Sequence, residues 1–263
     1  LAVKRAERVN GVDKVMPHIV KQMEKAHTSF YVEEKLDGER LLLHWARGAG
    51  GGSARVEFWS RQKVTFTQHY RRLYAPGRDA DSKHGIALGN FFLDKVDSVI
   101  LDGEMMMYNA WEERFEAFGS RPEVMNHYKN NTATGEVRPC FMVFDILYLN
   151  GESVIERMLS ERKRMLSEEL SKCWRSRTDG GMLELLPSVE VQSQRGGPTA
   201  DELMDAAMEK GAEGLVFKSP ISPYVLGSKD SSWIKLKPDY LDKYRETLDV
   251  ALVGGYYGHG SRA

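Results

Sequence analysis

The segment FYVEEKLDGERLLLHW, residues 30–45, joins two apolar runs through a short charged stretch that contains Asp37-Gly38. Asp-Gly is a turn signal, and a turn here would bring Lys35 and Arg40 close together. Gly38 has no side chain, so the backbone at this point can approach a ligand closely. A solvated hairpin without any ligand explains the same six residues equally well, and other segments must decide between the two interpretations.

Outward from this segment, the chain contains more strand-like runs than helix-like ones. A glycine-rich loop at 46–55 predicts a hairpin connection to the run VEFWSR at 56–61. Runs rich in Val, Ile, Leu and Phe predict further strands at residues 98–108, 140–149, 214–219, 232–237 and 248–258. Helical spacing predicts helices at 155–172 and 199–210, the second with a Thr199–Glu202 capping box. Because these helices do not alternate with the strands, we predict an α+β fold with mainly antiparallel sheets.

The charge composition is balanced. The 263 residues include 37 Lys and Arg against 38 Asp and Glu, a formal net charge of −1. Binding of nucleic acid through bulk positive charge needs a large excess of Lys and Arg, so that class of protein is excluded. No apolar run approaches the roughly 20 residues of a membrane-spanning helix, so we expect no membrane partner. Two cysteines, Cys140 and Cys173, are too few for a disulfide framework or a multi-cysteine zinc site.

Charged residues interrupt the predicted strands where a plain core strand would be apolar. Lys235 and Lys237 alternate with Ile234 and Leu236, so both lysines project from one face of their strand. Two like charges side by side are unfavourable unless an anion lies between them, although lysines also protect exposed edge strands. A polyphosphate with Mg²⁺ needs cations and carboxylates together. The chain offers this combination at Glu33, Lys35, Asp37, Arg40, Glu104, Glu213, Lys218, Lys235 and Lys237. A lysine among other cations can also become a nucleophile.

Five motifs follow one another in an order that resembles the covalent nucleotidyltransferases, specifically the ATP-dependent DNA ligases. They are KLDGER at 35–40, LDGEMMMYN at 101–109, FDILYLNG at 144–151, EGLVFKSP at 213–220 and SWIKLKPDY at 232–240. The resemblance runs from about Phe30 to the C-terminus and implies the ATP-grasp-like adenylation fold of that family. Residues 1–246 would form the adenylation domain, and residues 247–263 the start of a truncated OB-fold domain. The segment 247–262 is most similar to the ligase IV branch, the eukaryotic end-joining ligases, and the glycine-rich loop at 46–55 suits a fungal member.

The resemblance implies a role for each matching residue. Lys35 would attack the α-phosphate of ATP and carry AMP, which the family passes to a DNA 5′-phosphate before the break is sealed. Lys235 and Lys237 match the grip on the phosphates, and Glu104 and Glu213 match the residues that serve Mg²⁺ and ribose. Phe144 matches the aromatic ring that stacks on adenine. Other nucleotide contacts would come from Glu33, Glu34, Leu36, Arg40 and Lys218. Arg61 matches an arginine that meets DNA or nucleotide phosphate, and a surface arginine at the end of a strand explains this residue equally well.

The resemblance also sets expectations for the protein as a whole. We expect ATP and Mg²⁺ as cofactors, a nuclear location, and nicked or broken DNA as substrate of the full-length enzyme. The basic motif of the OB domain, the N-terminal DNA-binding domain and the C-terminal BRCT repeats, which hold an end-joining scaffold protein, lie outside this sequence. We therefore expect a monomeric fragment that binds ATP, adenylates itself slowly if at all, and does not seal DNA alone. The alternatives are an mRNA capping guanylyltransferase, which shares the Lys-x-Asp-Gly-x-Arg opening, and a non-catalytic nucleotide-binding module.

Overall fold

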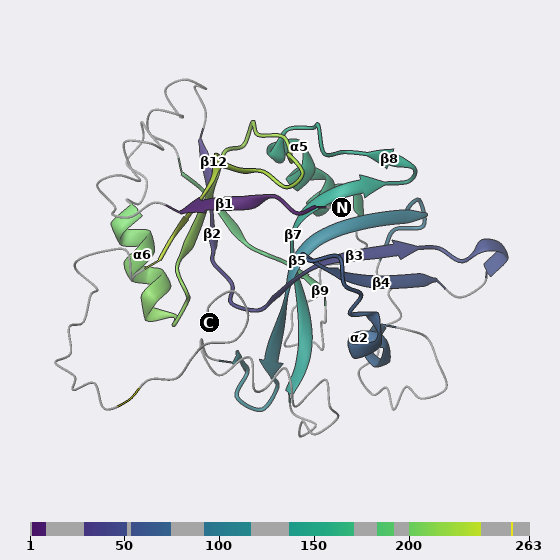
Figure 1. Ribbon diagram of the computed structural model, residues 1–263, viewed down its shortest axis with the longest axis horizontal. Coiled ribbons are helices and arrows are strands. Elements are labelled where there is room, and N and C mark those ends of the chain that lie inside the picture. The colour runs from purple at the N-terminus through teal and green to yellow at the C-terminus, as the bar shows by residue number, and fades with distance from the viewer. Residues whose placement is uncertain are drawn as a thin grey trace.

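In the part of the chain that the structure describes, two β-sheets form the framework. The computed structural model describes residues 2–8, 29–51, 54–74, 92–116, 137–170, 183–191, 200–237 and 254. Most of the strand pairings are antiparallel. Parallel pairings join β1, Arg5–Arg8, to β12, Lys229–Leu236, and β7, Val137–Leu149, to β9, Leu183–Leu185. The sheets carry short helices against their faces (Figure 1). The predicted α+β class with mainly antiparallel sheets is therefore confirmed.

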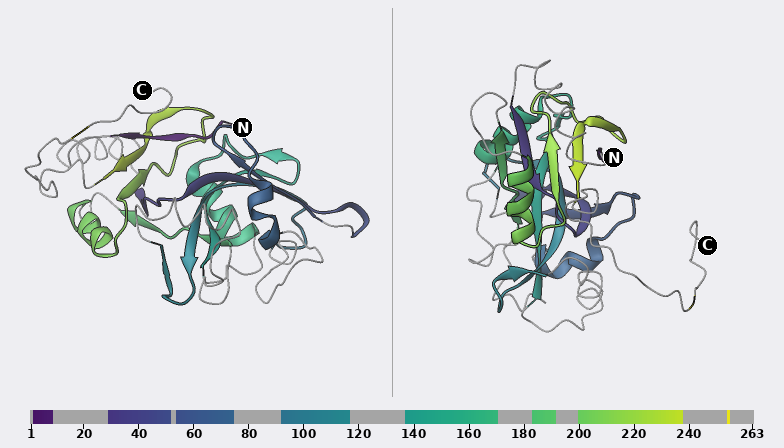
Figure 2. Two further views of the ribbon diagram at one scale, coloured as in Figure 1. Left: turned by 60° about the horizontal axis from the view of Figure 1, so that its bottom comes forward. Right: turned by 90° about the vertical axis from the view of Figure 1, so that its left-hand side faces the viewer.

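The first sheet has five strands in the order β1-β12-β11-β2-β10. Their bounds are Arg5–Arg8 for β1, Lys229–Leu236 for β12, Leu215–Lys218 for β11, Phe30–Glu34 for β2 and Ser188–Val191 for β10. Helix α6, Ala200–Glu209, packs on one face, where its Met204 meets buried Val32, Phe217 and Ile234. Figure 2 shows α6 lying along the outer side of this sheet. The opposite face, the polar face of this sheet, carries Glu33, Lys218 and Lys235 beside the apolar Val216 and Trp233.

The second sheet has seven strands, with the main order β4-β3-β5-β7-β8 and with β6 and β9 attached to β5 and β7. Their bounds are Glu39–Ala46 for β3, Arg55–Ser60 for β4, Ser98–Asn109 for β5, Arg114–Phe115 for β6, Val137–Leu149 for β7, Glu152–Ser153 for β8 and Leu183–Leu185 for β9. Leu41, Leu43 and Trp45 alternate along β3 and enter the main core. Helix α2, Thr67–Tyr74, follows β4 and contributes Tyr70 to the same core.

The segment 35–38 crosses from one sheet to the other. Strand β2 pairs with β11 and β10, whereas β3 pairs with β4 and β5, so the two strands on either side of Asp37-Gly38 are not partners. The hairpin interpretation of this segment is therefore wrong. Asp-Gly indicates a local change of chain direction, but it does not require the two flanking strands to pair with each other. Gly38 is required at the crossing, since an added Cβ would lie 2.2 Å from the backbone oxygen of Met105.

The other predicted elements agree with the structure except at some boundaries. The hairpin across 46–55 forms between β3 and β4, with a 3₁₀ turn at Ala49–Gly51. The helix predicted at 155–172 begins only at Leu159, as α5, Leu159–Arg164, and continues as a π-helical segment, Met165–Leu170. The chain before it is held by tertiary hydrogen bonds instead, from Tyr224 N to Ile155 O and from Leu159 N to Ser222 O.

Several predictions lie outside the described residues. They are the final strand at 248–258, of which only Gly254 is described, the domain boundary at 246–247, and the cap residue Thr199. Within the described part of the chain, no helix is long and apolar enough to cross a membrane.

Candidate active site between the two sheets

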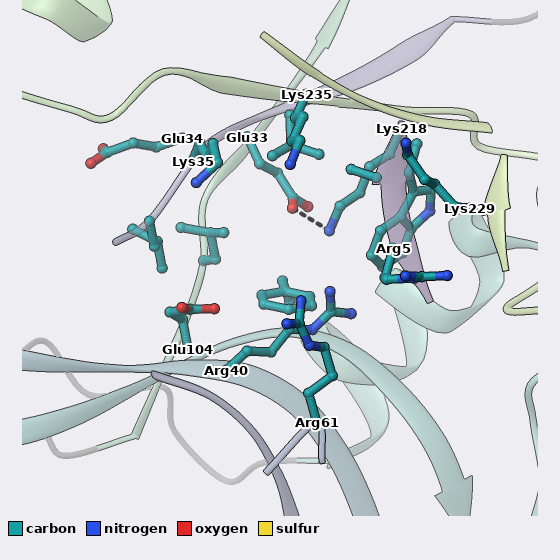
Figure 3. Close-up of a pocket in the computed structure, with 16 residues that line it drawn as sticks. Arg5, Glu33, Glu34, Lys35, Arg40, Arg61, Glu104, Lys218, Lys229 and Lys235 are labelled. Atoms are coloured by element: carbon teal, nitrogen blue, oxygen red, sulfur yellow. Dashed lines mark ion pairs between the residues drawn. The ribbon is translucent and has the colours of Figure 1, made fainter. Parts of the chain in front are cut away.

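A cavity of about 440 Å³ lies where the polar face of the five-stranded sheet meets β3, β5 and β7. Figure 3 shows lysines from one sheet facing Glu104, Arg40 and Arg61 from the other. Most of the predicted site residues line this cavity: Glu33, Glu34, Lys35, Leu36, Arg40, Arg61, Glu104, Phe144, Lys218 and Lys235. Glu213 and Lys237 do not line it but connect to it through ion pairs. The turn at 35–38, the strand ends and the alternating lysines thus belong to one site.

Strand register explains why these polar residues meet. Glu33 on β2, Val216 on β11 and Lys235 on β12 are paired across three neighbouring strands, and all three line the cavity. Their neighbours Val32, Phe217 and Ile234 form a second row that is buried against α6. The alternation predicted for the segment 232–237 is therefore correct, since Ile234 and Leu236 are buried on that opposite face.

Lys35 is held by both its backbone and its side chain. Its backbone N–H donates to the carbonyl of Gly214 at 2.8 Å, and its Nζ forms an ion pair with Glu213 Oε2. The other oxygen of Glu213 pairs with Lys237 Nζ. Burial would raise the pKa of Glu213, but its hydrogen bonds to Lys237 and Lys35 and their charges outweigh burial, so the pKa is lowered. Burial, followed by the charges of Lys35 and Lys237, lowers the pKa of Lys235. An anion at this end of the cavity would relieve that repulsion.

Arg40 is fixed from the opposite sheet. Its Nε and Nη2 donate to the two oxygens of buried Asp102 at 3.1 and 2.6 Å. Tyr224 also donates to Asp102, at 2.6 Å, and its hydroxyl in turn accepts the backbone N–H of Lys4. Asp102 thus orients Arg40. A fork of two charge-assisted hydrogen bonds leaves the guanidinium little freedom at the cavity wall.

Glu104 faces the crossing segment. Its Oε1 accepts the backbone N–H of Gly38 at 3.2 Å. Burial raises the pKa of this carboxyl to about 7, against the opposing charges of Arg40 and Lys35. A further cation beside Glu104 would favour its ionised form, so the group suits a metal ligand or a proton acceptor. Among the described residues, no three His, Cys, Asp or Glu side chains come together as a metal cluster.

Glu33 lies at the far end of the cavity, between two lysines. Its Oε2 pairs with Lys218 Nζ at 2.5 Å, and its Oε1 pairs with Lys163 Nζ from α5. Burial would raise the pKa of Glu33, but the charges and hydrogen bonds of Lys163 and Lys218 lower it. The carboxylate is therefore ionised although only 2% of the residue is exposed.

Two aromatic rings lie beside Lys218. Its Nζ lies 4.3 Å from the ring centroid of Phe144 and 4.1 Å from that of Trp233. Arg40 approaches the same rings, at 5.2 and 5.7 Å. Phe144 lines the cavity and is 8% exposed, so it is more than an ordinary core residue. Trp233 is buried in the core between the sheets and lines the cavity as well.

Sequence reasoning missed several residues of the site, among them four with polar side chains and the apolar Val216. Arg5 and Lys229 line the cavity, Tyr224 orients Asp102, and Lys163 pairs with Glu33. Lys229 lies an even number of residues before Lys235 on β12, and the alternation would have indicated it if the strand had been extended. The other three polar residues belong to no motif, and only the tertiary fold brings them to the site.

A family model and two curated relatives point to the same family. The family model described as "ATP dependent DNA ligase domain" matches residues 12–237. The DNA ligase 4 of Aspergillus oryzae is 35% identical over 235 residues, which are 89% of this chain and 22% of that protein. The DNA ligase 4 of Cryptococcus neoformans var. neoformans is 37% identical over 242 residues, 90% of this chain and 21% of that protein. The chain therefore spans about a fifth of the length of these curated relatives.

Solved structures share the fold. The ligase domain of M. tuberculosis LigD has a TM-score of 0.56 at 20% identity and covers 90% of this chain and 59% of that chain. The ATP-dependent DNA ligase of bacteriophage T7, in complex with ATP, has a TM-score of 0.53 at 18% identity and covers 90% and 68%. The nucleotidyltransferase fold predicted for the chain is thereby confirmed.

Proposed function

The chain belongs to the ATP-dependent DNA ligase family, and on this premise we propose that its cavity binds ATP and transfers AMP to Lys35. In this reaction the Lys35 nitrogen forms a bond to the α-phosphorus, the bond from that phosphorus to the bridging oxygen breaks, and pyrophosphate leaves. The observation that carries the proposal is the position of the Lys35 side chain, which lines the cavity beside the cations Lys235 and Arg40. Positioned cations of this kind neutralise charge on a transferring phosphoryl group.

The nucleophile must lose a proton before it attacks, because only the free amine has a lone pair. Glu213 accepts a hydrogen bond from Lys35 Nζ and is therefore within reach of that proton. The same carboxylate pairs with Lys237. When phosphate oxygens take over part of the attraction on the two lysines, Glu213 becomes a stronger proton acceptor for Lys35.

The other end of the cavity suits the nucleoside. We assign the base to the space beside Phe144 and Val216, both of which line the cavity, with Glu33 at its edge. An ionised carboxylate accepts hydrogen bonds and does not donate them, so it favours an exocyclic amino group over an oxo group. At position 6 of a purine ring, Glu33 would therefore accept a hydrogen bond from the amino group of adenine, whereas guanine presents an oxo group there. Arg40, Glu34 and Leu36 complete the proposed contacts to ribose and phosphate.

Mg²⁺ fits the residues present. Mg²⁺ in nucleotide sites is held by one or two carboxylates together with phosphates and water, and when bound it neutralises phosphate charge. Glu104 suits this role best, since burial leaves its carboxyl with a raised pKa that a cation would lower. Glu213, the second carboxylate predicted for the metal, already pairs with Lys35 and Lys237. It would bind Mg²⁺ only after these two lysines have moved to contact phosphate oxygens.

For the longer protein, we propose the sealing of DNA breaks in non-homologous end joining, in the nucleus. Its relatives are named DNA ligase 4, and the chain matches about a fifth of their length. AMP would pass from Lys35 to a DNA 5′-phosphate, with Arg61 at the cavity rim as a phosphate contact. Binding of DNA and of an end-joining scaffold protein would rely mainly on other parts of such a protein, and this chain alone would be a monomer.

Intact-protein mass spectrometry tests the proposal. The chain is first treated with pyrophosphate and Mg²⁺ to remove any resident AMP, and is then incubated with ATP and Mg²⁺. We expect one AMP on Lys35, and none in Lys35→Ala. AMP on another residue would contradict the assignment, and labelling from GTP in place of ATP would favour a capping guanylyltransferase. Equal ATP binding by both proteins with no adduct in either, also in a longer chain that carries the OB domain, would favour a non-catalytic module.

A further inference from the structure

Lys163 contacts the proposed base-reading carboxylate from outside the cavity. Its Nζ pairs with Glu33 Oε1, while Lys218, which does line the cavity, pairs with Oε2 at 2.5 Å. Only 12% of the Lys163 side chain is exposed, and its Nζ lies 5.6 Å from the ring centroid of Tyr31. Tyr31 and Glu33 share one face of β2. Lys163 therefore lies over that face, behind Glu33 as seen from the cavity.

Helix α5 holds Lys163 in this position. The residue before it, Arg162, is fully buried and binds both oxygens of Asp145 on β7, at 2.7 and 3.0 Å. Arg162 also donates to the carbonyl of Ser222 at 3.2 Å, and the first residue of the helix, Leu159, donates to the same carbonyl. These bonds fix the rotation of the helix. Lys163 thus reaches Glu33 from an anchored backbone, unlike a lysine on a free surface.

We propose that Lys163 is a positioning residue that holds the Glu33 carboxylate in the plane in which it accepts the 6-amino group of adenine. The terminal torsion of a glutamate is broad, so a carboxylate with one partner can turn. With a lysine on each oxygen its plane is set, and each oxygen keeps a second acceptor direction for a ligand. Lys218 cannot do this alone, because it binds one oxygen only. The inference rests on the proposed function and adds to it the residue that makes the acceptor rigid.

The test compares two nucleotides that differ only in the amino group. Lys163→Met removes the charge and keeps much of the apolar length of the side chain. The dissociation constant of ATP, measured without Mg²⁺ so that no AMP is transferred, should rise roughly tenfold, the effect of one lost charge-assisted hydrogen bond. The triphosphate of purine riboside, which lacks the 6-amino group, should bind the two proteins with constants within about twofold.

Two further variants separate positioning from general damage. Lys163→Arg restores a cation at this position and should recover most of the ATP affinity. Arg164→Met removes a cation from the next residue of α5, whose partner is the exposed Glu168, and should change neither dissociation constant. Melting temperatures of all variants report any loss of folded protein.

The outcomes distinguish the two proposals. If Lys163→Met weakens the binding of both nucleotides equally, or weakens the binding of neither, Lys163 does not position the acceptor. This conclusion holds whether or not AMP is transferred to Lys35. If the unmodified chain binds no ATP and gains no AMP on Lys35, the proposed function itself fails. Loss of affinity for ATP alone, with recovery in Lys163→Arg, supports the inference.

Discussion

Replacing Arg162 by Met should destabilise the protein far more than the same replacement at Arg164, the exposed arginine of α5. Arg162 and Asp145 are both fully buried, and the pair is bidentate, with N–O distances of 2.7 and 3.0 Å. The remaining guanidinium nitrogen donates to the backbone oxygens of Ser222 and Arg157. Met fills a similar volume, so the substitution removes mainly the charge and the donors. It leaves a carboxylate in the core that accepts a hydrogen bond from the backbone N–H of Ile146.

Breaking a buried ion pair from one side costs about 3–5 kcal/mol, because the other charge stays buried without compensation. That is a large part of the roughly 5–15 kcal/mol by which a domain is stable. In the double variant Arg162→Met with Asp145→Leu, no charge is left behind, so we expect a smaller loss than in the single variant. The matched control is Arg164→Met, since Arg164 and Glu168 are about half exposed and 3.4 Å apart. A surface pair of this kind contributes about 0.5 kcal/mol or less.

Equilibrium urea unfolding, followed by tryptophan fluorescence, measures these free energies. Arg162→Met should lose at least about 3 kcal/mol of unfolding free energy, and the double variant should recover part of that loss. A single variant that loses under about 1 kcal/mol, or a double variant that is no better than the single one, would refute the view that Asp145 is a charged group compensated by Arg162.

Two further predictions follow from the cavity. Burial raises the folded-state pKa of Glu104 to about 7 from a usual value of 4.5. Between these two values the folded state binds more protons than the unfolded state. The stability that this group contributes is therefore present below pH 4.5 and is lost as pH rises through 7. In metal-free buffer, thermal unfolding from pH 5 to 8 should therefore show the chain losing stability relative to Glu104→Gln, and parallel curves would contradict the raised pKa. In Gly38→Ala, the new Cβ would lie 2.2 Å from Met105 O and 2.8 Å from Met106 Sδ, so the crossing segment must move. We expect a loss of roughly 1–3 kcal/mol in unfolding free energy and a marked fall in AMP transfer to Lys35; unchanged transfer would show that the crossing has room to spare.

Local sequence patterns predicted the strands and also which side chains share one face of a strand, because this alternation depends only on neighbouring residues. The row that contains Lys235 followed directly from the period of two in residues 232–237. The crossing at Asp37-Gly38 was not predictable in the same way. A turn signal predicts that the chain changes direction but does not identify the strand partners. Strand β2 lies in a different sheet from β3 because it pairs with β10 and β11, whereas β3 pairs with β4.

The motifs located most of the cavity wall, since each motif carries a side chain that faces the cavity. The supporting residues escaped, because their contacts depend on distant parts of the chain. Lys163 is 130 residues from Glu33, and Tyr224 is 122 residues from Asp102. Neither residue lies in a segment whose composition differs from an ordinary surface helix or loop. Such partners become visible only when the sheets are assembled.

The two lysine-flanked carboxylates also bear on the overall charge of −1. Glu33 is shared by Lys163 and Lys218, and Glu213 by Lys35 and Lys237. In each trio two ammonium groups face one carboxylate, which leaves one positive charge over within the trio. A near-neutral molecule thus keeps an electropositive interior that is already oriented before any polyanion arrives, so little dipole reorganisation is needed on binding. The two carboxylates act as internal counter-ions: each one reduces the repulsion between its two lysines and keeps them close together, so the positive potential persists in the absence of a ligand.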